Sequence, residues 1–245
     1  MTRPPEQIVP YNSAENKAVQ VERMFDEIAD NYDVLNHTLS MGIDRFWRKK
    51  GILSLQDIHP RKILDVAAGT GDLSLEACRR LHPDSILGID ISEKMMQIGR
   101  QKVARAGLSG KISFERMDST ALTLEDNMFD AAMIAFGIRN FEHPDKGLQE
   151  IRRVLKPGGK LMILELSSPE RFPMKQLYTL YSKLVIPGTG RLVSKNKAAY
   201  HYLPKSISVF PQGKMMADIL RKNGFREVKY TFYTFGICAM YLATK

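Results

Sequence analysis

Ile63-Leu64-Asp65-Val66-Ala67-Ala68-Gly69-Thr70-Gly71-Asp72 is a short apolar run that leads into a glycine turn. The apolar run predicts a buried strand, and the glycines allow a ligand to approach the backbone closely. A helical pattern begins directly after the turn, so the free N–H groups of its first residues are available to an anionic group. The stretch therefore predicts a strand, a turn and a helix that together bind a nucleotide-like cofactor.

The alternation of short apolar runs with helical segments continues along the chain and is typical of βα units. We predict strands over 61–67, 85–91, 111–117, 129–136 and 160–166, and helices over 72–82, 93–107, 144–155 and 213–223. Ser92 should cap the second helix, Pro144 should open the third, and Gly224 should close the last. Residues 227–235 and 237–244 resemble a closing antiparallel hairpin.

These elements predict an α/β fold with a seven-stranded, mostly parallel sheet, an antiparallel last strand and helices on both faces. An antiparallel end fits the Rossmann-like sheet of class I methyltransferases better than an all-parallel dinucleotide fold. The length of 245 residues, with 44% hydrophobic and 26% charged residues, predicts one domain over 1–245.

Two segments lie outside the alternation. Residues 14–35 carry apolar side chains at every third or fourth position, which predicts one amphipathic helix, and we expect residues 1–55 to form an N-terminal helical lid. Residues 167–213 are interrupted by prolines and rich in aromatics, and we expect them to be an insertion that forms part of the substrate pocket.

Asp90 closes the second predicted strand about 20 residues after the glycine turn, where a ribose-binding acid is expected. NAD and S-adenosylmethionine both fit this spacing. Ser74 stands where the third glycine of G-x-G-x-x-G would be, which lowers the case for a pyrophosphate, whereas a methionine carboxylate needs only the shorter Gly69-Thr70-Gly71 turn. The residues favour an S-adenosylmethionine-dependent methyltransferase, with an NAD-dependent oxidoreductase and a non-catalytic nucleotide-binding module as alternatives.

The formal net charge of +9 is spread along the chain without a block of like charges. A solvated surface fits this pattern best, an anionic lipid face is the next alternative, and we predict no nucleic-acid partner because no RNA-binding or zinc-finger motif is present. Two cysteines, no signal-like start and no long apolar run predict a cytoplasmic protein. Peripheral contact with the inner face of the membrane and a homodimer both stay open.

Several motifs carry a family resemblance. Asp65–Gly71 resembles motif I of the class I methyltransferases, and Arg153–Gly159 resembles the turn before their fifth strand. The more specific stretches are Tyr32-Asp33-x-x-Asn36 continuing through Ser40 to Trp47-Arg48, Phe136-Gly137-Ile138-Arg139-Asn140, and Tyr202-Leu203-Pro204-Lys205-Ser206 ahead of Phe210-Pro211. Through them nearly the whole chain resembles the UbiE/MenG family of demethylmenaquinone and ubiquinone-pathway C-methyltransferases.

The resemblance implies S-adenosylmethionine as cofactor and a binding site at the glycine turn. Thr70 matches the family's threonine between Gly69 and Gly71, and Asp90 matches the acid of the second strand. The pair that contacts adenine in the family corresponds to Asp118 and Ser119. The alternatives are structural roles: Asp90 would be an acid at a helix N-terminus, and Asp118 an ordinary turn residue. Ala135 departs from the family, which often has a serine there.

The family's substrate is a polyprenylated quinol, which implies C-methylation of demethylmenaquinol to menaquinol in menaquinone biosynthesis. Methylation of 2-methoxy-6-polyprenyl-1,4-benzoquinol in ubiquinone biosynthesis is the alternative, and the departure at Ala135 favours the naphthoquinol. Met174 to Ile186 form a broadly apolar segment flanked by Arg171, Lys175, Lys183 and Arg191. This pattern fits a lid over the pocket or an interfacial helix, and the two are compatible.

Attack of a ring carbon on the sulfonium methyl requires orientation and an electron-rich ring, so a group that stabilises a phenolate should lie nearby. Arg139 and Asn140, just after the fourth strand, are the expected catalytic residues, with Tyr32 reaching in from the N-terminal helix. A surface ion pair for Arg139 and a core position for Tyr32 are the structural alternatives. His37 is expected to be a hydrogen-bonded surface histidine in a loop, with a catalytic role as the alternative, and we predict no metal site.

Overall fold

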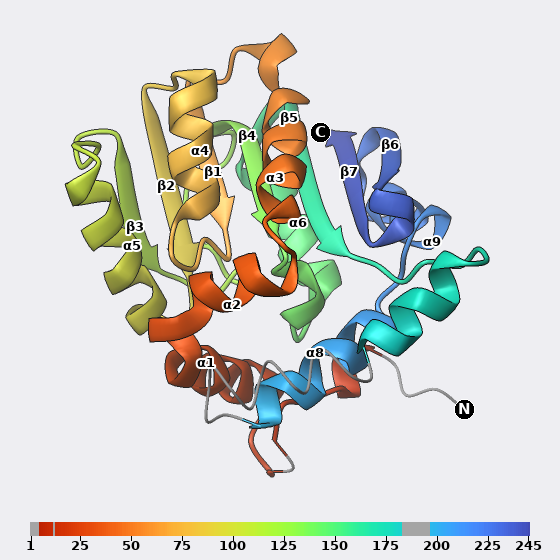
Figure 1. The fold of residues 1–245 in the computed structure, drawn as a ribbon. Coiled ribbons are helices and arrows are strands. Elements are labelled where there is room, and N and C mark those ends of the chain that lie inside the picture. The colour runs from red at the N-terminus through yellow and green to blue at the C-terminus, as the bar shows by residue number, and fades with distance from the viewer. Residues whose placement is uncertain (1–4, 12, 183–196) are drawn as a thin grey trace.

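The structure is a computed structural model that describes residues 5–11, 13–182 and 197–245. Seven strands form one sheet in the order β3-β2-β1-β4-β5-β7-β6 (Figure 1). The strands are β1 (Lys62–Val66), β2 (Ser85–Asp90), β3 (Ile112–Arg116), β4 (Phe129–Ala135), β5 (Leu155–Leu166), β6 (Arg226–Tyr233) and β7 (Cys238–Thr244). Strands β1 to β5 pair in parallel, and β7 is antiparallel to both β5 and β6. The mostly parallel sheet with an antiparallel last strand is therefore confirmed.

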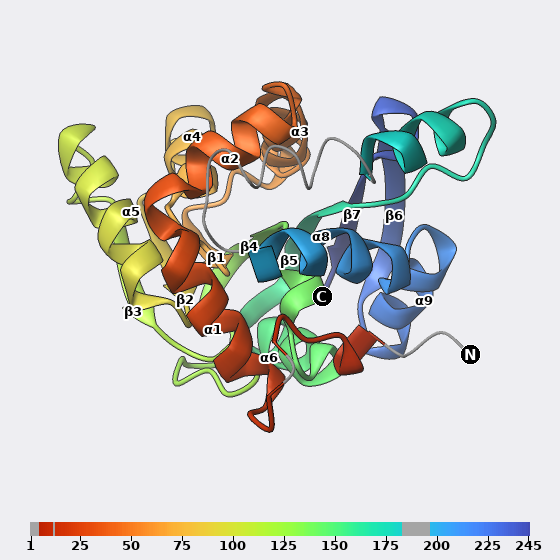
Figure 2. The same ribbon diagram turned by 60° about the horizontal axis from the view of Figure 1, so that its bottom comes forward.

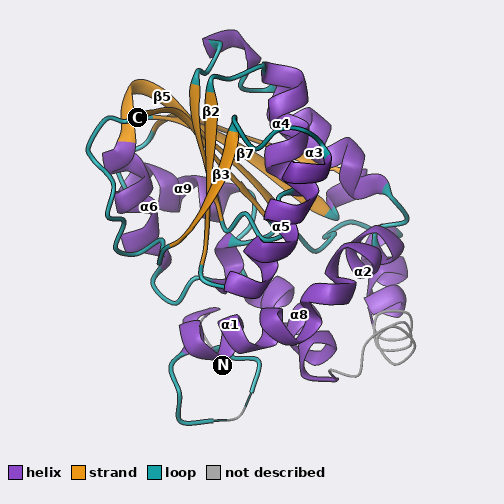
Figure 3. Cartoon of the chain, turned by 90° about the vertical axis from the view of Figure 1, so that its left-hand side faces the viewer, coloured by secondary structure: helices purple, strands orange, loops and turns teal. Residues whose placement is uncertain are grey.

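Helices cover both faces of the sheet (Figure 3). One face carries α3 (Ile43–Leu53), α4 (Asp72–Leu81) and α5 (Glu93–Arg105), and the other carries α6 (Pro144–Val154) and α9 (Lys214–Lys222). Strand β1 shows why both faces must be covered: Ile63 packs in one core, whereas Leu64 and Val66 pack in the other. A central parallel strand is buried on both sides and reads as a continuous apolar run.

The predicted helix ends are confirmed. The Ser92 hydroxyl accepts a hydrogen bond from the Met95 N–H at 3.1 Å and so caps α5. Pro144 is the first residue of α6, and Gly224, with φ of +85°, follows α9. The predicted start of the fifth strand at residue 160 is wrong, because β5 begins at Leu155, and the residues between 155 and 160 form an irregularity in its pairing with β4.

The prediction of one helix over 14–35 is also wrong. The segment forms α1 (Lys17–Ile28), a 3-10 turn (Ala29–Asn31) and α2 (Tyr32–Leu39). A 3-10 turn takes three residues, so the recurrence of apolar side chains passes through the break unchanged while the chain changes direction. Periodicity alone could not reveal it.

The N-terminal helices and α8 (Lys197–Val209) lie across the carboxyl ends of the parallel strands (Figures 1 and 2). The 167–213 segment contributes α8, which contains Pro204, and a second helical stretch at 174–182. The remainder of the apolar segment predicted up to Ile186 lies outside the described residues. Within the described ranges, no helix is both long and apolar enough to cross a membrane.

Candidate active site

A pocket of about 830 Å³ opens where β1, β2 and β4 end. Val66, Asp90 and Ala135, the last residues of these strands, all contribute to its wall. Helix α1 closes the pocket from the opposite side through Ala18, Val21 and Phe25. Four of the residues predicted to bind the cofactor line it together: Gly69, Asp90, Asp118 and Ser119. We refer to it as the strand-end pocket.

Asp90 is held by the backbone around it. Its Oδ2 accepts the Gly69 N–H at 2.8 Å, and its Oδ1 accepts the Ser92 N–H at 2.9 Å. Burial raises the pKa of this carboxyl, against the lowering effect of the two backbone hydrogen bonds. A carboxylate has about four acceptor positions, so Asp90 keeps acceptor capacity for a ribose hydroxyl.

Thr70 and Gly71 do not line the strand-end pocket. The Thr70 hydroxyl instead donates to Asp33 Oδ1 at 2.5 Å, which ties the glycine turn to α2. Gly71 has φ of +78° and precedes α4, and a Cβ there would lie 2.8 Å from the Phe114 ring. Cofactor contacts by these two residues stay a prediction.

A second, larger cavity of about 1030 Å³ lies next to the first. We call it the aromatic cavity, because its wall is mostly aromatic and aliphatic. Its lining comes from the N-terminal helices, the 174–182 helical stretch and α8, and includes Met24, Leu35, Trp47, Tyr178, Tyr181, Tyr200, Tyr202 and Ile207. Phe25, Tyr32 and Phe136 border both cavities. The site is therefore two adjoining chambers with a shared wall.

Arg139 lies in the wall of the aromatic cavity and is only 8% exposed. Its Nη1 contacts Glu165 Oε1 at 2.5 Å and donates to the Phe136 carbonyl at 2.6 Å. Its Nε is buried and has no hydrogen-bond partner among the residues that the structure describes. Burial acts to lower the pKa of the guanidinium, but Glu165 outweighs it and the pKa is raised. Arg139 is thus a charged, buried group with an unused donor, and the surface alternative is wrong.

Asn140 and Tyr32 lie beside Arg139. Asn140 Oδ1 accepts the Tyr202 hydroxyl at 3.0 Å, and Asn140 itself lines the strand-end pocket. Tyr32 packs edge-on against Phe25 with ring centroids 5.8 Å apart. Burial raises the pKa of Tyr32 despite its hydrogen bond with Asn36, so the phenol keeps its proton at neutral pH. The structure places Arg139 in the wall of the aromatic cavity, Asn140 in the wall of the strand-end pocket and Tyr32 in the wall that the two share.

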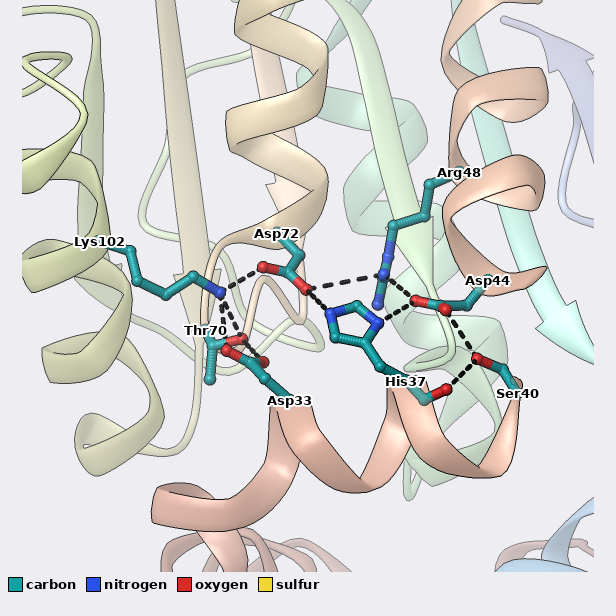
Figure 4. A network of polar contacts seen from close by, with 8 residues as sticks. All are labelled: Asp33, His37, Ser40, Asp44, Arg48, Thr70, Asp72 and Lys102. Carbon is teal, nitrogen blue, oxygen red and sulfur yellow. Dashed lines mark hydrogen bonds and ion pairs between the residues drawn. The ribbon is translucent and has the colours of Figure 1, made fainter. Parts of the chain in front are cut away.

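Sequence reasoning missed two carboxylates of the site. Glu165, the partner of Arg139, is the second-last residue of β5. Asp44 lies in the first turn of α3 and lines the aromatic cavity. His37, predicted to be a hydrogen-bonded surface residue in a loop, lies in α2 and contacts Asp44 Oδ2 through Nδ1 at 2.9 Å (Figure 4). No sequence spacing links these groups, because their contacts depend on how α2, α3 and the strands pack.

No group of three or more histidine, cysteine, aspartate or glutamate side chains suited to a metal ion occurs within the described part of the chain.

Comparison with known proteins gives concordant matches. The model of the ubiE/COQ5 methyltransferase family matches residues 12–245. A demethylmenaquinone methyltransferase of Bacteroides fragilis is 56% identical over 245 residues, which cover 100% of both chains. Among solved structures, a SAM-dependent methyltransferase of Thermotoga maritima, described as a possible histamine N-methyltransferase, has a TM-score of 0.60 at 19% identity and covers 91% of this chain and 98% of its own.

A second solved structure carries a ligand. Phosphoethanolamine N-methyltransferase 2 of Haemonchus contortus, in complex with S-adenosyl-L-methionine, has a TM-score of 0.56 at 15% identity. The match covers 76% of this chain and 48% of that protein. At these identities the two structures bear on the fold alone.

Proposed function

This chain belongs to the ubiE/COQ5 methyltransferase family, and we propose that it methylates a ring carbon of demethylmenaquinol, with S-adenosylmethionine as donor. The observation that carries the proposal is the buried Arg139, which lines an apolar cavity next to the pocket that contains Asp90 and keeps an Nε–H with no partner among the described residues. This arrangement can hold a quinol oxygen in one chamber and a nucleoside in the other.

The strand-end pocket fits S-adenosylmethionine. Its wall combines the apolar side chains Val21, Phe25 and Ile89 with a few polar groups, as is usual for small-ligand sites. Asp90 offers its remaining acceptor positions to the ribose, Asp118 and Ser119 lie where they can flank the adenine, and the Gly69 turn can approach the methionine carboxylate. When bound, S-adenosylmethionine supplies an electrophilic methyl group on a sulfonium.

The residues at the boundary orient the quinol and stabilise charge on it. Arg139 cannot take up a proton, so its guanidinium would act as a donor to the quinol oxygen and favour the electron-rich form of the ring. Tyr32 keeps its proton and borders both chambers, so it can hold a substrate oxygen or exclude water. Asn140 fixes Tyr202 in the wall. Orientation of this kind provides a large part of the acceleration in a displacement reaction.

The naphthoquinol is favoured over the benzoquinol by the name of the relative from B. fragilis, which matches this chain over its whole length. The aromatic lining of the larger chamber suits a fused ring, because stacked and edge-on ring contacts add to the energy of burial.

The polyprenyl tail needs an exit, and we propose that it leaves beside the 174–182 helical stretch. Tyr178 and Tyr181 of this stretch line the aromatic cavity, whereas Leu177 is 56% exposed and Leu180 is 58% exposed. Phe172, just before it, is 82% exposed. Apolar side chains on both sides of one helix suit contact with the tail and, at the membrane surface, with lipid.

Replacing Leu177 and Leu180 together by serine should therefore lower kcat/KM for a long-tailed quinol by about tenfold or more, while a tail-less analogue reacts nearly as before. Steady-state methylation of both substrates in the presence of vesicles measures the difference. Met215→Ser, at an exposed apolar residue of α9 on the sheet, is the matched control and should change neither rate. Equal losses on both substrates would show that the leucines support the fold and not the tail.

A further inference from the structure

The aromatic cavity contains two formally charged side chains in its described lining, Arg139 and Asp44. Arg139 is paired with Glu165 and has no capacity to accept a proton. The pKa of Tyr32 is raised by burial, and burial raises the pKa of Tyr178 to about 12, so both phenols hold their protons. Asp44 is thus the carboxylate of this wall, and its side chain is only 3% exposed.

Asp44 is fixed by three donors (Figure 4). Its Oδ1 accepts the Ser40 hydroxyl at 2.7 Å, and its Oδ2 contacts His37 Nδ1 at 2.9 Å and the Arg48 guanidinium. Ser40, like Asp44, lines the cavity. Because a carboxylate has about four acceptor positions, one position stays open for a ligand. Burial acts to raise the pKa of Asp44, but the hydrogen bond from Ser40, the charge of Arg48 and the hydrogen bond with His37 together outweigh it, and the pKa is lowered.

We propose that Asp44 accepts the hydroxyl proton of the quinol during methyl transfer; this inference rests on the proposed function. As the ring carbon bonds to the methyl group, the S–CH₃ bond breaks and its electron pair stays on sulfur. Electrons move from the hydroxyl oxygen into the ring, so the O–H becomes far more acidic than that of a free phenol, whose pKa is about 10. A carboxylate of low pKa is then a sufficient acceptor.

The second half of the reaction restores the aromatic ring. The methylated carbon loses its hydrogen as a proton to water, and Asp44 returns its proton to the same oxygen. One proton is released in total, the donor loses its positive charge, and Asp44 ends in its original ionised state. No further reactant is needed.

The competing explanation is that Asp44 has only a structural role, in a network of ion pairs that holds the N-terminal helices against the rest of the fold. His37 Nε2 lies 3.6 Å from Asp72 Oδ2, and Arg48 also lies 3.6 Å from that oxygen. Lys102 joins Asp72 to Asp33, the acceptor of the Thr70 hydroxyl. These groups come from α2, α3, α4 and α5 and form one network, in which Asp44 and Asp72 contact His37 and Lys102 contacts Asp72 (Figure 4). Lys102 belongs to this ion-pair network but does not line the aromatic cavity, so its replacement provides a control for a purely structural effect.

The test is single-turnover methylation of demethylmenaquinol, without oxygen and with saturating donor, for the parent, Asp44→Asn and Lys102→Gln. The parent should have a rate that is nearly constant between about pH 6 and about pH 8.5, because its base is already ionised there. Asp44→Asn should be about 100-fold slower near neutral pH and should gain about tenfold per pH unit as the quinol ionises by itself. Lys102→Gln should keep the flat profile of the parent.

Three outcomes would overturn the assignment of Asp44. A parent rate that rises tenfold per pH unit would show that no protein base assists. This measurement uses only the parent protein, so it is valid even if a variant fails to fold. If the rate of Asp44→Asn is independent of pH and is reduced by the same factor as that of Lys102→Gln, the role of Asp44 is structural only. An unchanged rate in Asp44→Asn would remove it from the reaction. A parent that is stabilised by S-adenosylhomocysteine but methylates no quinol would instead refute the proposed function, and the assignment with it.

Discussion

Replacing Arg139 by alanine should slow methylation of the quinol at least about 100-fold, while the affinity for S-adenosylmethionine stays nearly that of the parent. The guanidinium lines the aromatic cavity and keeps a buried Nε–H that no described residue accepts, so its replacement removes both a positive charge and a donor from the wall of the cavity. Single-turnover rates and calorimetric binding of the cofactor measure the two effects separately. Arg139→Lys should recover only part of the rate, because a point charge cannot replace a planar two-pronged donor.

The ion pair with Glu165 requires a control for this experiment. Both partners are buried, and an unpaired carboxylate at that position would cost about 3–5 kcal/mol of stability. The double variant Arg139→Met with Glu165→Gln removes both charges and should fold better than Arg139→Ala, yet it should be just as slow. If the double variant recovers the parent rate, the loss in Arg139→Ala reflects a damaged fold, and Arg139 has no part in the chemistry.

Replacing Asp90 by alanine should weaken S-adenosylmethionine binding by more than about 100-fold. Two hydrogen bonds from ribose hydroxyls to a carboxylate contribute about 1.5–3 kcal/mol each, and about 1.4 kcal/mol corresponds to a factor of ten. The variant also leaves the N–H groups of Gly69 and Ser92 without their acceptor. S-adenosylhomocysteine should raise the Tm of the parent but not that of Asp90→Ala, because only binding to the native state stabilises it.

Asp90→Asn is the matched variant, since it keeps one acceptor oxygen and should retain part of the affinity. NADH should raise the Tm of none of these proteins. If Asp90→Ala binds S-adenosylmethionine as tightly as the parent, the nucleoside does not bind in the strand-end pocket.

The carboxyl ends of the parallel strands could be predicted because each of them is marked by residues close by in the sequence. The apolar run before Gly69, the acid at Asp90 and the proline that opens α6 are all short-range signals. The break between α1 and α2 could not be predicted, since the 3-10 turn at Ala29–Asn31 preserves the apolar spacing.

The site was predicted in part for the same reason. Arg139 and Asn140 follow β4 directly, so their place at the edge of the sheet follows from the strand. Their partners Glu165 and Tyr202 come from β5 and α8, and only the packed structure brings them near. Asp44 gave no signal, because a lone acid at the start of a helix is usually a terminal charge.

The central claim is that this chain transfers a methyl group to carbon on a quinol ring. The most direct measurement is incubation of the purified protein with methyl-labelled S-adenosylmethionine and demethylmenaquinol under reducing conditions, followed by mass spectrometry of the product. The account predicts one labelled methyl per molecule, bound to a ring carbon, and no product from the oxidised quinone, whose ring is too electron-poor to attack. A label on oxygen, or no labelled quinol at all from a protein that binds the cofactor, would contradict it.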